Sequence, residues 1–255
     1  MELTDSQYAL LSPLLPVQRG NVKIDNWRLL NALLYVAENG CKWRRLPKEF
    51  GNWHTIYTRL RRWADRGVLE RIFETLQRQR LIAIRIECLG LDSTNVKVHP
   101  DAMGALKKGG PQAIGKSRGG WNTKIHMVAA DDRTAVTFSL SPGQASDGVE
   151  GRALLEDWQD KPEALPENLP MAMDRAYEGD ETRASVTQAG FSAVVPPKHN
   201  RKEPWDYDEE LYKRRNEVER LFRKLKGFRR IFTRFEKLDI MFRAFLHLAL
   251  AYLIL

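Results

Sequence analysis

The fold turns on residues 89–98, which read Leu-Gly-Leu-Asp-Ser-Thr-Asn-Val-Lys-Val. Apolar residues open this stretch and alternate with polar ones in its second half, and that pattern predicts a β-strand. In the region before it, hydrophobic residues recur at helical spacing, as at Trp27, Leu30 and Leu34. The chain therefore changes near residue 87 from a helical region to one built around a sheet.

The region before this strand is predicted to be almost entirely helical. Thr4 and Gln7 have the spacing of a capping box, Asp25 can start a second helix, and Gly40 can end it. Two further helices are expected, over about residues 54–66 and 69–82. We expect residues 1–84 to form a helical domain that resembles a helix-turn-helix module and binds DNA.

Strands and helices alternate in the region after it. Residues 99–120 are rich in Gly and Lys and predict a loop. The elements expected beyond the loop are strands at 123–130 and 134–140, a helix at 150–158, a strand at 169–173, a helix at 179–189, a strand at 191–195, and helices at 208–226 and 238–255. This order predicts an α/β domain over residues 85–255, whose mixed sheet begins as an antiparallel meander and ends in βαβ units.

Composition narrows the class of protein. The 255 residues carry a formal net charge of +8, which favours a polyanionic partner, nucleic acid first. Charge alone would also fit a ribosome-associated or membrane-surface protein. The two cysteines, Cys41 and Cys88, form no zinc-binding motif. The N-terminus lacks the pattern of a signal peptide, and the apolar stretch 244–255 is too short to span a bilayer, so we expect a cytoplasmic protein.

Two aspartates stand at the ends of apolar runs. Asp92 lies in the strand 89–98, and Asp174 follows the run 169–173. Carboxylates at strand ends in an open α/β sheet are well placed to face a ligand, and two of them side by side call for a divalent cation such as Mg²⁺. The alternatives stay open, since Asp92 could form a turn and Asp174 could cap a helix.

A third carboxylate lies on the predicted helix 208–226. At about 100° per residue, Tyr212, Arg215, Glu219 and Lys226 fall within an arc of roughly 60° on one helix face. A solvated stripe of ion pairs is the alternative, because Arg215 and Glu219 are four residues apart. A separate apolar stripe lets the helix pack; it consists of Leu221, Phe222 and Leu225.

The spacing of those four residues resembles the signature of bacterial insertion-sequence DDE transposases. The segments that begin at Asp92 and Asp174 resemble the first and second acidic motifs of that group. The match is nearest to the IS-five family, which residues 40–47, 107–120 and 123–126 also resemble. The neighbouring Glu217 does not fit the motif spacing, so the third acidic position is assigned to Glu219.

The resemblance implies an RNase H-like fold and metal-dependent strand cleavage and transfer. It implies that Asp92, Asp174 and Glu219 are the catalytic metal ligands, for two Mg²⁺ ions that Mn²⁺ can replace. Tyr212, Arg215 and Lys226 would hold phosphates or bases of the element's end. The implied partner is double-stranded DNA, as transposon ends and as target, and a homodimer is expected in the DNA complex. The alternative is a catalytically silent, DNA-binding regulator derived from a transposase.

Other basic residues are expected to contact DNA phosphates. The predicted helix 54–66 can bury Ile56, Leu60 and Trp63, and it carries Arg59, Arg61, Arg62 and Arg66. A solvated basic face on a structural helix is the alternative. The Gly-rich loop adds Lys107, Lys108, Lys116 and Arg118.

Some motifs carry weaker interpretations. Residues 110–117 match the letters of a nucleotide-binding P-loop, but no strand precedes them and Gly119 discourages a helix after them, so no nucleotide is expected. Trp205 and Tyr207 could stack on an unpaired base or anchor the core. His99 and His126 have no partners at metal-ligand spacing and are interpreted as structural or close to DNA.

Overall fold

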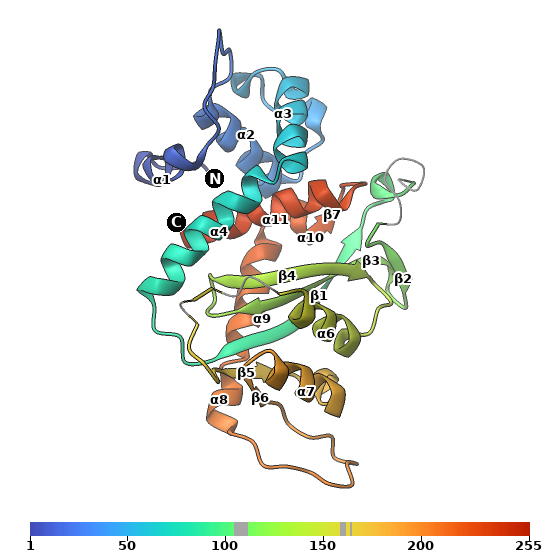
Figure 1. Cartoon of the computed structure of the whole chain (residues 1–255). Coiled ribbons are helices and arrows are strands. Elements are labelled where there is room, and N and C mark those ends of the chain that lie inside the picture. The colour runs from blue at the N-terminus through green and yellow to red at the C-terminus, as the bar shows by residue number, and fades with distance from the viewer. Residues whose placement is uncertain (105–111, 159–161, 164) are drawn as a thin grey trace. The chain divides into compact units, whose positions relative to one another are not determined.

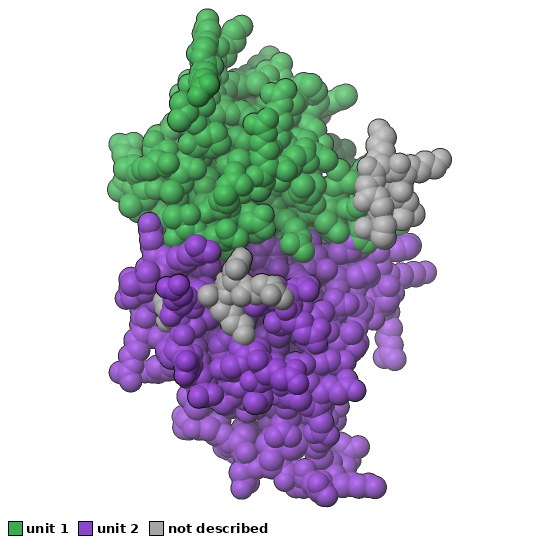
Figure 2. All heavy atoms as spheres, in the orientation of Figure 1, with its two compact units in different colours: residues 1–76, 98–112, 225–255 green, residues 77–97, 113–224 purple. Residues whose placement is uncertain are grey.

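The chain divides into two compact units in the computed structural model, which describes residues 1–104, 112–158, 162–163 and 165–255. Unit 1 comprises residues 1–76, 98–112 and 225–255, and unit 2 comprises residues 77–97 and 113–224; Figure 2 colours them separately. These units do not follow the boundary predicted between residues 84 and 85. The reason is that the C-terminal residues make their contacts within unit 1.

Unit 1 is helical, as expected for the first part of the chain. It contains α1 (Asp5–Leu11), α2 (Asn26–Asn39), α3 (Trp53–Asp65), most of α4 (Val68–Ala83), α10 (Arg229–Phe232), the short strand β7 (Thr233–Arg234) and α11 (Asp239–Ile254), with 3₁₀ turns at Ser12–Leu14, Trp43–Arg45, Lys48–Phe50 and Pro100–Ala102. The capping box of Thr4 and Gln7 is present, and Gly40 ends α2 in the left-handed conformation at φ 63°.

The core of unit 1 forms around α11. This helix is apolar on most sides and packs against α2 and α3, so its burial depends on the N-terminal helices. His247 is 7% exposed and stacks on Phe73 with ring centroids 5.7 Å apart. Burial lowers the pKa of His247 to about 3, so the ring is neutral and serves the core.

Unit 2 is built on a mixed sheet (Figure 1). Its strands are β1 (Leu89–Val98), β2 (Gly115–Ser117), β3 (Gly120–Ala129), β4 (Ala135–Pro142), β5 (Pro170–Met173) and β6 (Ser192–Val194). β3 pairs antiparallel with β1, β2 and β4, whereas β5 pairs parallel with β1 and β6. An antiparallel meander thus leads into parallel strands, as predicted, and the expected mixed α/β sheet flanked by helices, with a helical N-terminal region, is confirmed.

Helices cover both faces of this sheet. They are α6 (Asp147–Asp157), α7 (Asp180–Gln188), α8 (Glu209–Lys213) and α9 (Asn216–Gly227), with a 3₁₀ turn at Arg175–Tyr177. Gly151 of α6 lies near Leu91, and Val218 of α9 lies against Gly90. Because consecutive residues of a strand point to opposite faces, α6 and α9 pack on opposite sides of β1.

Two predictions about local structure are wrong. The region 99–120 is not all loop, since Gly115–Ser117 form β2 and Gly120 begins β3. The helix predicted over 208–226 is interrupted at Arg214 and Arg215. There the backbone forms tighter i to i−3 hydrogen bonds, from Arg214 to Leu211 and from Arg215 to Tyr212, so one helical phase does not run through the whole segment.

The apolar C-terminal stretch belongs to α11, as predicted, and is buried within unit 1. Among the described helices, none combines the length and apolarity needed to cross a bilayer.

Candidate active site in unit 2

Strand pairing brings Asp92 and Asp174 to neighbouring positions. β1 and β5 run parallel, and the pairing register ends with Leu91 opposite Met173. Asp92 and Asp174 are the next residue of each chain segment, so they lie beside each other at the same edge of this pairing. Asp174 also caps the following 3₁₀ turn, where its Oδ1 accepts a hydrogen bond of 2.7 Å from the Ala176 backbone N–H. Asp174 therefore caps this turn, as the alternative interpretation held, and also stands at the end of a strand.

Close packing of α9 on β1 brings Glu219 to the same place. A Cβ atom on Gly90 would lie 3.1 Å from Val218 Cγ1, so glycine permits this approach of helix to strand. Val218, Leu221, Phe222 and Leu225 are buried, which confirms the predicted apolar stripe. The neighbouring Glu219 stays partly exposed, at 42% of its side-chain surface.

Arg215 joins two of the three predicted catalytic carboxylates. Its Nη1 lies 2.7 Å from Glu219 Oε1 and 3.3 Å from Asp92 Oδ2. Burial lowers the pKa of Arg215, but the charges of Glu219 and Asp92 outweigh that effect and raise it overall. Arg215 is thus a cation held between two acidic groups, and its ion pair with Glu219, which belonged to the alternative interpretation of this helix face, is present.

Asp92 carries more negative charge around it than Arg215 can offset. Burial and the nearby carboxylates of Asp174 and Glu219 raise its pKa to about 6, against the lowering effects of Arg215 and of the Ser93 N–H bonded to its Oδ1. Only 14% of the Asp92 side chain is exposed. A carboxyl group in this state gains from an added cation, because a cation relieves both repulsions.

The opposite face of β1 holds a different polar cluster, which sequence reasoning missed. Ser93 Oγ donates a hydrogen bond of 2.7 Å to Asp147 Oδ1, and Lys124 Nζ lies 2.9 Å from the same oxygen. Burial favours a raised pKa for Asp147, but the bonds from Lys124 and Ser93 lower it overall. Ser93 therefore links this satisfied cluster to Asp92 through the strand backbone.

The remaining predicted members of the motif lie on both sides of the helix break. Tyr212 is on α8, and the Arg215 guanidinium lies 5.7 Å from the centroid of its ring. Tyr207 packs edge-on against Tyr212 with centroids 5.6 Å apart. Lys226 lies two turns beyond Glu219 on α9, and partial burial lowers its pKa.

The oxygen donors of this site suit a hard divalent cation, but they are not gathered around one point. Within the described parts of the chain, no three His, Cys, Asp or Glu side chains lie close enough together to hold one metal ion. The Arg215 guanidinium takes up the space between Asp92 and Glu219. Carboxylate oxygens are nevertheless the donors that suit Mg²⁺ or Mn²⁺.

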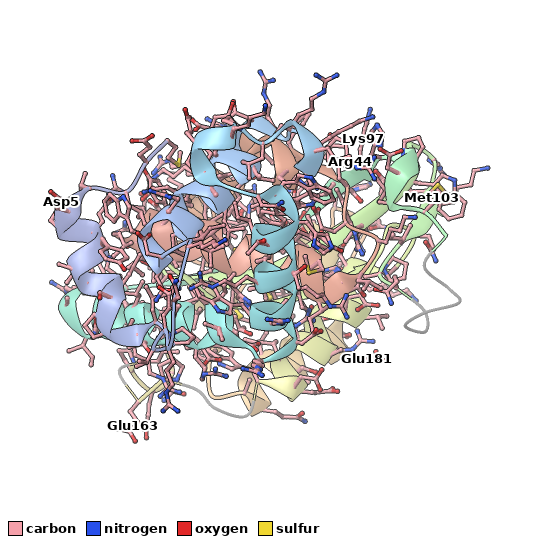
Figure 3. The ribbon with its side chains drawn as sticks, turned by 90° about the horizontal axis from the view of Figure 1, so that it is seen from above. Asp5, Arg44, Lys97, Met103, Glu163 and Glu181 are labelled. Atoms are coloured by element: carbon pink, nitrogen blue, oxygen red, sulfur yellow. The ribbon has the colours of Figure 1, made fainter. Side chains whose placement is uncertain are left out.

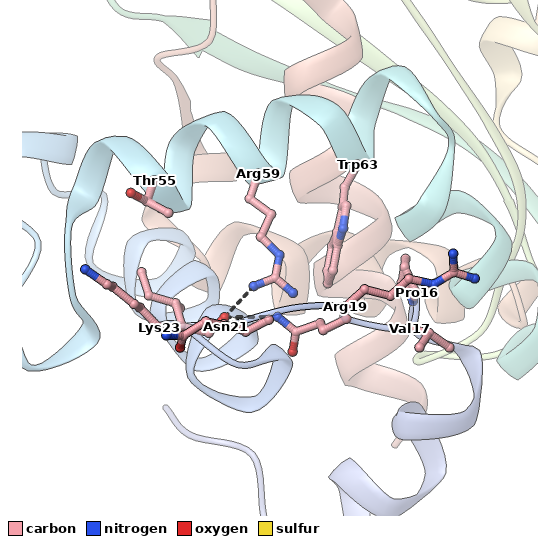
Figure 4. A pocket seen from close by; sticks show the side chains of 11 residues that line it. Pro16, Val17, Arg19, Asn21, Lys23, Thr55, Arg59 and Trp63 are labelled. Carbon is pink, nitrogen blue, oxygen red and sulfur yellow. Dashed lines mark hydrogen bonds between the residues drawn. The ribbon is translucent and has the colours of Figure 1, made fainter.

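The predicted DNA-contacting arginines of α3 have unequal roles. Arg59 Nη1 donates a hydrogen bond of 2.6 Å to the Ile24 carbonyl, and its guanidinium lies 5.4 Å from the Trp63 ring centroid (Figure 4). Arg59 also bonds Asn26. It holds the loop before α2 in place. Arg61 pairs with Asp65 at 3.0 Å, whereas Arg62 and Arg66 are exposed. The buried face predicted for this helix is present.

The basic loop forms a hairpin in its described part. Lys116 and Arg118 are exposed on β2 and its turn, while Lys107 and Lys108 fall outside the described residues. The segment that matches the P-loop letters continues into β3, where a P-loop needs a helix.

The uncertain aromatic and histidine residues have structural contacts. Trp205 lies between Arg183 and Arg201, whose guanidinium carbons are 3.7 and 4.7 Å from its ring, and its Nε1 donates to the Val195 carbonyl. This favours the core anchor over a free stacking platform. His126 is fully buried and hydrogen-bonds Ser141, and burial lowers its pKa to about 4. His99 caps a 3₁₀ turn.

Comparison with known proteins places the chain in a family. Residues 3–73 match the family model described as "Putative transposase of IS4/5 family", and residues 83–254 match the model "Transposase DDE domain". The chain belongs to the DDE transposases. The expected membership in this group of insertion-sequence transposases is thus confirmed, and the family implies use of a divalent metal ion.

Individual relatives agree with this assignment. A protein of Brucella ovis named "Putative transposase for insertion sequence element IS6501" is 30% identical over 51% of this chain and 95% of its own length. An uncharacterised protein of insertion element IS402 from Burkholderia cepacia is 31% identical over 42% of this chain and 77% of its own. Among solved structures, the Mos1 transposase paired-end complex with left transposon end aligns at 11% identity over 85% of this chain and 79% of that chain, with a TM-score of 0.29, too low to support an argument.

Proposed function

We propose that this transposase cuts and joins DNA at the carboxylates of Asp92, Asp174 and Glu219. The observation that carries the proposal is the meeting of three acidic groups: Asp92 lies beside Asp174 where the β1–β5 pairing ends, and Arg215 bonds both Asp92 and Glu219. Such a cluster favours a divalent cation, and two Mg²⁺ ions, replaceable by Mn²⁺, fit the chemistry of DNA strand cleavage. We propose residues 1–84 as the part that recognises the ends of the element, and two copies of the chain as the assembly that joins two ends.

The chain's own residues would share the work of the reaction. Metal ions at this site would activate the attacking water and stabilise the leaving oxygen of a phosphodiester. Asp92, held by the Ser93 N–H, and Asp174, held by the Ala176 N–H, are already oriented by the backbone. Glu219 is more exposed than Asp92, at 42% against 14% of the side-chain surface, so it can turn toward a ligand.

Arg215 has two roles in this proposal. Without a ligand it neutralises Asp92 and Glu219, and it leaves their oxygens when a cation takes its place. A released guanidinium can then hold a DNA phosphate through paired hydrogen bonds. Tyr212 lies over this guanidinium, and Lys226 follows on α9, so both are proposed to support the end of the element.

The test of the proposal is cleavage of a DNA fragment that carries the element's own ends, in Mg²⁺ or Mn²⁺. Asp92→Asn, Asp174→Asn and Glu219→Gln are each expected to lower the nicking rate by more than about 100-fold, since even outer-shell changes at metal sites cost about 10–100-fold. Nicking that persists in all three variants would contradict the proposed site.

Glu217→Gln is the matched control for Glu219→Gln. Glu217 is on the same helix but pairs with Arg220, at 3.0 Å. We expect this variant to nick at close to the normal rate. Loss of activity in Glu217→Gln, with activity kept in Glu219→Gln, would move the third acidic position. Wild-type protein that binds the ends without nicking them would support the regulator instead.

A further inference from the structure

Unit 1 contains a cavity of about 570 Å³. All of its lining residues belong to unit 1, so it includes none of the carboxylates proposed as catalytic in unit 2. Its walls are largely aromatic. The lining residues that matter here are Trp43, Trp53, Tyr57, Phe235, Glu236 and Lys237. All four aromatic side chains are partly exposed, and Phe235 also stacks on His99 with ring centroids 4.5 Å apart. The volume lies in the range of pockets that hold small organic groups.

Several contacts fix these aromatic walls. Trp43 meets Tyr57 edge-on with ring centroids 5.3 Å apart. Arg230, which is 5% exposed, lies 5.8 Å from the Trp43 ring centroid and 5.0 Å from that of Phe235. Its Nε also pairs with Glu236 Oε1 at 2.7 Å. The walls therefore form a preorganised site, which lowers the entropic cost of binding a flat ring.

One residue that lines the cavity, Glu236, has a buried acceptor that lacks a partner in the described part of the chain. Glu236 is 6% exposed, and its Oε2 has no hydrogen bond among the described residues. An unsatisfied buried acceptor costs free energy that a ligand with an N–H donor can recover. Nucleobases combine such donors with a flat aromatic face.

Several basic side chains lie next to the cavity at the surface, and the acidic Asp101 lines it as well. Arg44 and Arg45 follow Trp43 directly and are exposed, and Lys237 is exposed beside Glu236. Arg44 also lies 5.7 Å from the Trp53 ring centroid. In Figure 3, Arg44 and Met103 mark the two segments that meet near this cavity, since their neighbours Trp43 and Gly104 both line it. Cations next to aromatic faces are the arrangement that binds unpaired nucleic acid.

We propose that this cavity accepts an unpaired nucleobase of bound DNA, which stacks on Trp53 and Trp43. The proposal rests on the proposed function in that the base belongs to DNA handled by this enzyme. α3 links the two roles, because Trp53, Tyr57 and Arg61 follow one another at intervals of four along that helix.

The test is fluorescence anisotropy with three labelled duplexes: one fully paired, one with a single bulged nucleotide, and one with an abasic bulge. Stacking of one base contributes about 1–3 kcal/mol, so we expect the bulged duplex to bind about 10-fold more tightly than the abasic one. Trp53→Ala should bring this ratio to about one and leave binding of the paired duplex unchanged. Trp53→Phe, which keeps an aromatic face, should retain part of the ratio.

Phe232→Ala is the matched control, because Phe232 is an aromatic residue of unit 1 that is 58% exposed and does not line the cavity. It should keep the full ratio. Equal binding of bulged and abasic duplexes by the wild type would overturn the proposal, as would a Trp53→Ala variant that loses affinity for all three alike. Displacement of the bulged duplex by micromolar deoxynucleoside monophosphates would assign the cavity to free nucleotides and also overturn it.

Binding is measured without divalent cations, so the result does not depend on the carboxylates of unit 2. If the wild type prefers the bulged duplex but the nicking test fails, the proposed catalytic site is contradicted and the proposed base-binding cavity is supported. If nicking is normal but the bulged duplex is not preferred, the base-binding cavity is contradicted and the catalytic site is supported.

Discussion

The carboxylates of Asp92 and Asp147 lie on opposite faces of strand β1, and their electrostatic environments differ. Asp147 receives Lys124 and the Ser93 hydroxyl on a single oxygen, and its pKa is lowered overall. Asp92 shares Arg215 with Glu219 and has Asp174 nearby, and its pKa is raised to about 6. The protein neutralises the Asp147 carboxylate with its own side chains. It leaves the charge at Asp92 to be neutralised by a ligand.

The largest expected effect that separates these two groups is on stability. Asp92 has a folded-state pKa above its ordinary 3.8, so the native state binds more protons than the unfolded chain between about pH 4 and 6, and its stability falls as the pH rises through that window. We therefore expect Asp92→Asn to raise the free energy of unfolding at about pH 8 by up to about 3 kcal/mol, a gain that vanishes below about pH 4. Urea unfolding across this pH range measures it.

Asp147→Asn should act in the opposite direction. Its carboxylate is stabilised by Lys124 and Ser93, so its contribution is present above the ordinary pKa and is lost as the pH falls through the lowered one. We expect a loss of about 1–2 kcal/mol at neutral pH, allowing for its partial exposure. If both variants lose stability alike, the two carboxylates do not differ in the way described.

A smaller effect is expected from the cation that Asp92 shares. Arg215→Met removes a lowering influence while Asp174 and Glu219 remain, so the pKa of Asp92 should rise above about 6 by about one unit. Carboxyl carbon shifts followed by NMR measure this directly. Lys124→Met is the matched control, since it removes the cation of the other face and should raise the pKa of Asp147. An unchanged pKa of Asp92 in Arg215→Met would show that the guanidinium does not neutralise it.

The smallest expected effect concerns DNA binding by the arginines of α3, some of which are bonded within the protein and some exposed. Arg59 is satisfied by Ile24 and Asn26, whereas Arg62 is exposed and Arg61 pairs only at the surface with Asp65. Arg61→Ala combined with Arg62→Ala should reduce the salt dependence of duplex binding by about one to two phosphate contacts. Arg59→Ala should destabilise the protein and leave that slope unchanged. Anisotropy titrations at several salt concentrations distinguish them, and the reverse pattern would contradict these assignments.

Local patterns predicted most elements of this fold and failed at particular residues. The strand 89–98 and the apolar stripe of α9 follow from side-chain periodicity, which depends on sequence alone. The break at Arg214 and Arg215 did not, because it accompanies ion pairs of Arg214 with Glu87 and of Arg215 with Asp92, which bridge distant parts of the chain. β2 has three residues, too few for any periodic signal.

The same holds for the candidate site, where contacts between distant segments could not be predicted from local patterns. The three carboxylates could be proposed from strand ends and from the family resemblance, since both are visible in the sequence. The network of Ser93, Lys124 and Asp147 depends on the pairing register of β1 and β3 and on where α6 begins. The aromatic cavity likewise brings Trp43, Trp53 and Phe235 together from separate segments, and no spacing in the sequence indicates that meeting.

We propose that the Asp92 cluster takes a divalent cation and that the Asp147 cluster does not. Titration of Mn²⁺ monitored by electron paramagnetic resonance tests it directly in the wild type, Asp92→Asn and Asp147→Asn. We predict that Asp92→Asn loses Mn²⁺ affinity by at least about 10–100-fold, while Asp147→Asn keeps most of it. Equal Mn²⁺ affinity in all three proteins, or a loss only in Asp147→Asn, would contradict the account.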